Sequence, residues 1–221
     1  MTDFISGDKV MDYSRAFGAE FREVQDRVHD GKPVRVVAAS RTYATDQDDL
    51  WDALTNEDRI PRWFAPITGD LKLGGRYQIE GNAGGTITRC DRPEAFDLTW
   101  EYGESTSWVV VRLQPDGDGT RLSLEHIISK DKADEEHWTK YGPGATGVGW
   151  DLSFLQLGLH LDSGGKAIDH EANETWMSSD GGKSFMRDSA EEWGKAHVTG
   201  GEAPSVAAAM ATRTAKAYAG E

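Results

Sequence analysis

Residues 96–102 have the sequence FDLTWEY, and residues 146–161 have the sequence TGVGWDLSFLQLGLHL. The first stretch alternates apolar and polar side chains, which is typical of a β-strand with one face in a core. The second is apolar on nearly every side of a helix, which is typical of a helix that other elements cover. A sheet with one apolar face needs a cover, and this helix is the long apolar segment best placed to provide it.

Five further stretches have the composition of strands, and glycine or proline clusters separate most of them. The expected strands are residues 34–43, 76–80, 86–90, 96–102, 107–113 and 120–129. Their connections are short, so neighbouring strands are expected to be antiparallel. Thr45 and Asp46 are good N-cap residues for a helix through Leu54, and a helical turn is expected over residues 57–63. The sequence predicts an α+β domain at residues 34–161, in which a curved antiparallel sheet surrounds the long helix and leaves an apolar pocket.

Residues 1–33 contain an apolar stripe with the spacing of a helix. Its members recur at intervals of three or four residues and are Tyr13, Phe17, Phe21, Val24 and Val28. This spacing predicts a leading amphipathic helix, which Gly31 and Pro33 would terminate. A lone helix with such a face would expose its apolar side chains, so we expect it to pack on the domain or on a second copy of the chain.

Residues 162–221 begin with Gly164-Gly165 and a polar stretch to Ser179, which together predict a linker. Two helices are expected after this linker, one around residues 185–196 and an alanine-rich one around residues 204–218. The apolar stripes of both helices are narrow. We therefore expect them to pack on the main domain or across a homodimer, and the sequence leaves both arrangements open.

The composition excludes several classes of partner. The chain has 221 residues, a net charge of −14 and a single cysteine, Cys90. An evenly negative surface repels phosphate groups, so neither nucleic acid nor an anionic membrane surface is an expected partner. The sequence has no run of about 18 apolar residues, and its N-terminus lacks the pattern of a secretory signal. We therefore expect a cytoplasmic protein, where a lone cysteine stays reduced.

Sequence motifs for nucleotide and metal sites are incomplete. Gly182-Lys183-Ser184 resembles the end of a phosphate-binding loop, but Met177 occupies the position of that loop's first glycine. His170-Glu171 would open a zinc-protease motif, but Glu174 occupies the position of the second histidine. The histidines have no ligand spacing, and Cys90 has no local motif of a nucleophile. We therefore expect no metal site and no cofactor.

The pocket is expected to be lined by bulky side chains from the sheet, the helical turn and the long helix. The expected lining residues are Trp63, Phe64, Tyr77, Ile79, Leu98, Trp100, Trp108, Leu124, His126, Trp150, Asp151 and Phe154. Alternation places His126 on the apolar face of its strand, and Asp151 follows Trp150 on the helix. If both face the cavity, they form a His/Asp pair that could move a proton on a bound substrate. The alternative for His126 is a core histidine bonded to a backbone carbonyl.

Four segments carry a resemblance to a known family: residues 41–90, 97–102, 120–126 and 141–154. They are similar to the bacterial SRPBCC (START-like) superfamily, in the branch homologous to the C-terminal domain of the heat-shock-90 ATPase activator. The specific part is the Trp51 helix, the turn at residues 61–64, Gly74-Gly75 and Thr99-Trp100. The resemblance covers residues 34–161 and implies a helix-grip (START/Bet v-like) fold with an inner pocket. Superfamily relatives bind lipids, hormones or polyketides, or cyclise them.

Three functions remain open. The favoured one is non-enzymatic binding of a small hydrophobic molecule, which requires a cavity of at least about 300 Å³. The second is a cyclase or dehydratase, a lyase or isomerase in which His126 and Asp151 share one cavity as catalytic residues. The third is interaction with a chaperone or another protein partner through the acidic surface. The ligand, the reaction and the oligomeric state are not readable from the sequence.

Overall fold

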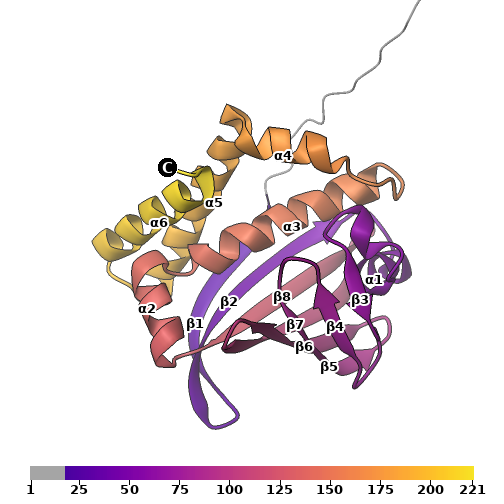
Figure 1. Cartoon of the computed structure of the whole chain (residues 1–221), viewed down its shortest axis with the longest axis horizontal. Helices are drawn as coiled ribbons and strands as arrows, with labels where there is room; N and C mark the ends of the chain where they lie inside the picture. Colours follow the sequence, from indigo (N-terminus) through magenta and orange to yellow (C-terminus); the bar gives the residue numbers. More distant parts are fainter. Residues whose placement is uncertain (1–17) are drawn as a thin grey trace, which may run out of the picture.

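The computed structural model describes residues 18–221, with only the backbone of Lys132 and Ala133. Within this range eight strands form one antiparallel sheet in the order β1-β2-β8-β7-β6-β5-β4-β3. The strands are β1 (Phe21–His29), β2 (Lys32–Tyr43), β3 (Ile67–Gly69), β4 (Arg76–Ile79), β5 (Gly84–Asp91), β6 (Ala95–Tyr102), β7 (Ser105–Asp116) and β8 (Gly119–Ser129). The sheet is strongly curved, and its concave face receives the helices (Figure 1).

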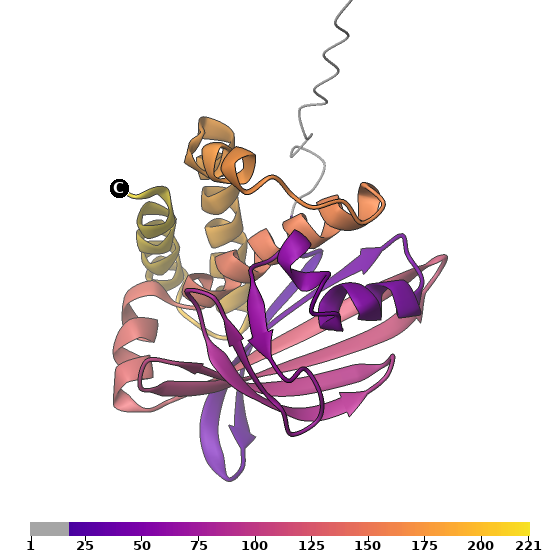
Figure 2. The same cartoon turned by 45° about the vertical axis from the view of Figure 1, so that its right-hand side comes forward.

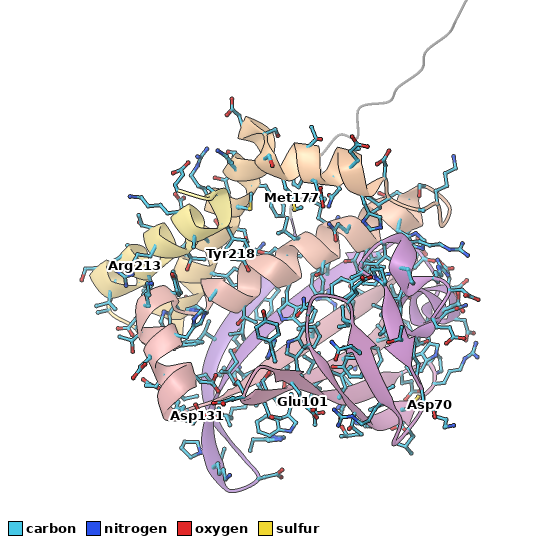
Figure 3. All side chains as sticks on the ribbon, viewed as in Figure 1. Asp70, Glu101, Asp131, Met177, Arg213 and Tyr218 are labelled. Carbon is cyan, nitrogen blue, oxygen red and sulfur yellow. The ribbon has the colours of Figure 1, made fainter. Side chains whose placement is uncertain are left out.

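The helices form a second layer and a third one beyond it. They are α1 (Gln47–Thr55), the 3₁₀ turn η2 (Ile60–Arg62), α2 (Lys132–Tyr141), α3 (Gly144–Asp162), α4 (His170–Ser178), α5 (Asp180–Thr199) and α6 (Pro204–Ala219). α3 crosses the concave face of the sheet, and α5 and α6 lie on the far side of α3 (Figure 2). Side chains from α3 and the sheet fill most of the space between them (Figure 3).

The predicted α+β helix-grip architecture is confirmed, and the local signals behind it have the expected structural causes. α1 begins where the Asp46 carboxylate accepts a hydrogen bond from the Asp49 backbone N–H at 2.8 Å, which satisfies a donor of the first turn. The expected cover, residues 146–161, is α3. Tyr43 on β2 fixes this helix over the sheet, because its hydroxyl donates to the Phe154 carbonyl at 2.9 Å.

The predicted leading helix is wrong wherever the structure describes it. Phe21, Val24 and Val28 lie on strand β1, which pairs along its whole length with β2. Tyr13 and Phe17 lie outside the described residues. The sheet therefore begins ahead of Val34, the residue at which the sequence placed the start of the domain.

The apolar stripe led to a wrong prediction because its spacing fits a strand as well as a helix. Val24 and Val28 are four residues apart, and an even spacing puts two side chains on one face of a strand as well as on one face of a helix. Phe21 is at an odd distance from them and is 52% exposed. The decisive signal was Asp30-Gly31, where both residues have positive φ, 47° and 75°. An Asp-Gly pair of this kind forms the tight turn of a hairpin.

The C-terminal segment differs from the prediction in its first part and agrees in the rest. The predicted linker was residues 162–179, and half of it forms helix α4, which begins after the N-cap residue Asp169. The two later helices are present as α5 and α6. Both pack within the same chain: Trp193 of α5 is fully buried, and the Tyr218 hydroxyl of α6 donates to the Ala145 carbonyl of α3 at 2.8 Å (Figure 3).

Candidate functional site

An apolar cavity of about 140 Å³ lies between α3 and the sheet. Nine of the predicted residues line it: Trp63, Phe64, Tyr77, Ile79, Leu98, Trp100, Leu124, Trp150 and Phe154. Further lining residues come from α1, η2, the β3–β4 connection and the middle strands, among them Leu54, Ile60, Leu71, Ile87, Cys90, Phe96, Val111 and Leu122. None of the described residues that line this inner cavity is charged. It therefore suits an apolar group.

The aromatic side chains of the inner cavity use their polar atoms elsewhere. The Tyr77 hydroxyl donates to the Thr99 carbonyl at 2.8 Å, and the Trp63 indole N–H donates to the Ala53 carbonyl at 2.9 Å. Burial raises the pKa of the Tyr77 hydroxyl, so it remains a neutral donor. With these atoms bonded to the backbone, the cavity presents mainly hydrocarbon surface.

The inner cavity is smaller than the sequence-based expectation. Its volume is about half of the 300 Å³ that we required, and pockets for drug-sized ligands range from roughly 300 to 1,000 Å³. A cavity of about 150 Å³ lined by apolar side chains holds a molecule the size of benzene. The cavity thus has the volume of one ring or a short aliphatic segment.

An outer cleft of about 270 Å³ adjoins the inner cavity. Its lining residues are Phe64, Asn82, Trp100, His126, Ala145, Thr146, Gly149, Trp150 and Ser153. Four of these, Phe64, Trp100, Trp150 and Ser153, also line the inner cavity and form the wall between the two spaces. The outer cleft differs in chemistry because it contains amide, hydroxyl and imidazole groups.

In this wall, both ring nitrogens of His126 are hydrogen-bonded to other side chains. The Trp150 indole N–H donates to His126 Nδ1 at 3.1 Å, so Nδ1 is the acceptor and the proton lies on Nε2. Nε2 then donates to the Ser107 hydroxyl at 2.8 Å, which donates onward to the Trp100 carbonyl at 3.2 Å. Burial lowers the pKa of His126 to about 4. His126 is a neutral core histidine, bonded to two side chains rather than to a backbone carbonyl.

Asp151 does not face either cavity, which corrects the predicted pocket. Its carboxylate, fully buried, accepts from the Ala19 backbone N–H at 2.8 Å and from Arg22 Nε at 3.0 Å. It also accepts from the Ser189 hydroxyl and from the Trp193 indole N–H at 3.1 Å. We call this cluster the Asp151 junction. His126 and Asp151 therefore do not form the expected pair, because neither bonds the other and Asp151 lines neither the inner cavity nor the cleft beside it.

Trp108 is a second correction, because it lies on the convex face of the sheet. It contacts the His29 ring at a tilt of 49°, with ring centroids 4.6 Å apart, and packs with Val36 and Ile127. β7 contains the sequence WVVVRL, in which the charged Arg112 is four residues from Trp108 and so shares its face of the strand. This signal, which the sequence analysis did not use, assigns Trp108 to the polar face. The inward residues of this strand are Val109 and Val111.

The cavity face of α3 carries a signal that the sequence analysis missed. Trp150, Ser153, Phe154 and Leu157 all line the inner cavity. Their spacing of three, four and seven residues is that of one helix face, and Asp151 is rotated from it by about 100°. Anchored on Trp150, this periodicity would have selected Ser153 and Leu157 and excluded Asp151.

The described part of the chain gives no indication of a metal centre or a membrane span. No group of three or more histidine, cysteine or acidic side chains in residues 18–221 has the arrangement of a metal site. Over the same residues, no helix combines the length and the apolar character needed to cross a bilayer.

Solved structures with the same fold include CalU16 from Micromonospora echinospora. Its solution structure is 29% identical, with a TM-score of 0.68, and the match covers 83% of this chain and 97% of CalU16. Its crystal structure is 28% identical, with a TM-score of 0.63, over 80% and 96% of the two chains. Protein MLL2253 from Mesorhizobium loti, at 22% identity and a TM-score of 0.52 over 58% and 98%, shares the fold.

No curated protein sequence matches the chain. A family model described as "Activator of Hsp90 ATPase homolog 1-like protein" matches residues 44–162, which is more than half of the sequence. That segment begins after β2 and ends with α3, so it contains most of the sheet, the helix across it and both cavities. The chain therefore belongs to the family of Activator of Hsp90 ATPase homolog 1-like proteins, within the START-like superfamily that the sequence resembled.

Proposed function

We propose that this protein binds a small apolar molecule, or the apolar part of a larger one, in the inner cavity. The observation that carries the proposal is an uncharged, mostly hydrocarbon cavity in the centre of a packed domain. An empty cavity of about 140 Å³ costs about 3 kcal/mol of stability relative to a filled core. A bound apolar group restores the missing contacts, so the fold gains stability from its ligand.

The lining favours a flat ring over a branched aliphatic group. Trp63, Tyr77 and Trp100 present ring surfaces, and aromatic pairs gain energy beyond the area that they bury. The family description names an Hsp90 ATPase activator, but the proposal rests on the cavity and not on that name.

We also infer a cytoplasmic location, where Cys90, half-buried at the cavity wall, would stay reduced.

Fluorobenzene is a suitable probe because it is uncharged, fits a benzene-sized space and is followed by ¹⁹F NMR. We expect it to bind the full chain. Val111→Phe should weaken this binding at least tenfold, because the new ring fills the inner cavity. Val110→Phe is the matched control: Val110 neighbours Val111 on β7 but packs on the convex face. The control should retain the wild-type affinity.

Cys90 provides an independent measurement, because it is the only cysteine of the chain and lines the inner cavity. Bound fluorobenzene should slow its alkylation by N-ethylmaleimide in the wild type and in Val110→Phe. Absence of fluorobenzene binding, or equal weakening by both phenylalanine substitutions, would refute the proposal.

A further inference from the structure

We propose that the outer cleft is the polar half of the same binding site and holds an uncharged hydrogen-bonding group of the ligand, such as a hydroxyl, a ketone or an amide. This inference rests on the proposed function, because it assigns the inner cavity to the ligand's apolar ring. It specifies the ligand class as an uncharged molecule in which a ring and a polar group are a few bonds apart.

The two spaces share a wall of four lining residues. Phe64, Trp100 and Trp150 contribute rings to it, and Ser153 contributes a hydroxyl. The rings of Trp100 and Trp150 meet edge to face with centroids 5.4 Å apart. His126 bonds Trp150 but not Phe64, so the Phe64 ring is the part of the wall that a ligand can displace to join the spaces. The joined site reaches the volume that the inner cavity lacks.

His126 fixes the position of this wall but has no nitrogen left for a ligand. Its Nδ1 accepts from Trp150, and its Nε2 bonds Ser107. Its ring also meets both tryptophans edge to face, with centroids 5.9 Å away in each case. His126 is thus a positioning residue for Trp150, and the polar contacts of a ligand must come from other groups.

Three side chains of the outer cleft can bond a ligand. Among the described residues, the Thr146 hydroxyl has no hydrogen-bond partner. Asn82 accepts from the Ala83 backbone N–H through Oδ1 at 2.8 Å, which leaves its amide N–H groups as donors in the cleft. Ser153 donates to the Gly149 carbonyl at 2.9 Å and keeps acceptor capacity. These groups offer both donors and an acceptor, which match a hydroxyl, a carbonyl or an amide.

The electrostatics select against a charged ligand. None of the described residues that line either space carries a charge, since His126 is neutral. A ligand carboxylate that entered this site would lose its contacts with water and find no cation to replace them, in a protein whose net charge is −14. An ammonium group would likewise find no carboxylate in the lining, because Asp151 belongs to the junction on another side of α3.

The test compares three probes with the same ring and chain length, all followed by ¹⁹F NMR on the full chain. They are 1-fluoro-4-propylbenzene, 3-(4-fluorophenyl)propan-1-ol and 3-(4-fluorophenyl)propanoate. We expect the alcohol to bind at least fivefold more tightly than the propyl compound and at least tenfold more tightly than the carboxylate. A fourth probe, 3-(4-fluorophenyl)propan-1-amine, is expected to be weaker than the alcohol.

Thr146→Val removes the hydroxyl and keeps the shape of the side chain. It should abolish most of the alcohol's advantage over the propyl compound while the propyl compound binds as before. Thr212→Val is the control, since Thr212 is exposed on α6 and its hydroxyl bonds its own helix. Both variants should unfold at wild-type temperatures, which a thermal melt verifies.

The outcomes separate this inference from the proposed function. If fluorobenzene and all four longer probes fail to bind, both are wrong. If the propyl compound binds and the alcohol shows no advantage, the inner cavity is a binding site and the outer cleft is not part of it. Equal or tighter binding of the carboxylate or the amine would overturn the assignment of an uncharged ligand.

Discussion

Trp150 and Asp151 are adjacent on α3 and face different sides of it, about 100° apart around the helix axis. Trp150 lines both cavities and donates to the neutral His126. Asp151 accepts hydrogen bonds from four donors, which lie just before β1, on β1 and on α5. The Trp150 side of the helix is neutral and borders the cavities, while the Asp151 side carries a charged carboxylate that accepts several hydrogen bonds. The buried carboxylate of Asp151 thus connects α3 to the segments on either side of it in the sequence and borders neither cavity.

Asp151→Ala is expected to cause the largest effect, because it leaves the Arg22 guanidinium buried without its carboxylate. Breaking a buried ion pair in this way costs about 3–5 kcal/mol. The free energy of unfolding, measured with urea, should fall by that amount, whereas Asp162→Ala at the exposed end of α3 should change it by less than about 0.5 kcal/mol. If Asp151→Ala kept the wild-type stability but lost fluorobenzene binding, Asp151 would belong to the binding site and not to a purely structural junction.

The His126 side should show a smaller effect that appears only in acid. The pKa of His126 is about 4 in the folded protein and near its ordinary value of 6.5 in the unfolded chain. The unfolded state therefore binds the proton first, and stability present above about pH 6.5 is lost as the pH falls towards 4. We expect the wild type to lose about 2.5 kcal/mol from this group between about pH 7.5 and pH 4.5.

His126→Asn is the reference for that measurement, because an asparagine keeps an acceptor for the Trp150 indole and does not titrate. Burial also lowers the pKa of His160 and of His197, so both proteins lose stability in acid from these groups. The His126 contribution is the difference between the two urea series. Parallel pH profiles would show that His126 is not the buried neutral group described above.

A third prediction tests the helix surface itself. Gly147 lies where α5 meets α3, and a Cβ there would be 2.2 Å from Trp193 Cε2. Gly147→Ala should therefore destabilise the protein by about 2 kcal/mol. At Gly158 a Cβ would be an ordinary 3.5 Å from Tyr43 Cε1, so Gly158→Ala should stabilise it by up to about 1 kcal/mol. Thermal melts should shift in opposite directions, and shifts of the same sign would contradict the packing described.

The sequence predicted the sheet and the cavity where polar residues mark one face of an element. Alternation placed Leu98, Trp100 and Leu124 correctly because each has polar neighbours on both sides. The prediction was wrong at Trp108, which was chosen as a bulky ring although Arg112 marks that face of the strand, and at Asp151, which was chosen because it follows Trp150. In both cases the period of the element, counted from Arg112 on the strand or from Trp150 on the helix, indicated the correct side.

The outer cleft could not be predicted, because its residues come from distant parts of the chain. Asn82 is in the β4–β5 connection, His126 is on β8 and Thr146 is in the first turn of α3. No local pattern links them. Strand β1 was predictable in principle from Asp30-Gly31, but its pairing with β2 depends on a hairpin that the helical spacing concealed.

The Asp151 junction also sets an order of events during synthesis. Asp151 belongs to the family segment 44–162, yet Ala19 and Arg22 precede that segment and Ser189 and Trp193 follow it. A ribosome makes Ser189 and Trp193 38 and 42 residues after Asp151. The nascent family segment therefore holds a carboxylate that lacks half of its donors until α5 has been released. The Asp151 junction is thus complete only after α5 has left the ribosome, so the family segment depends on a later part of the chain to satisfy one of its buried charges.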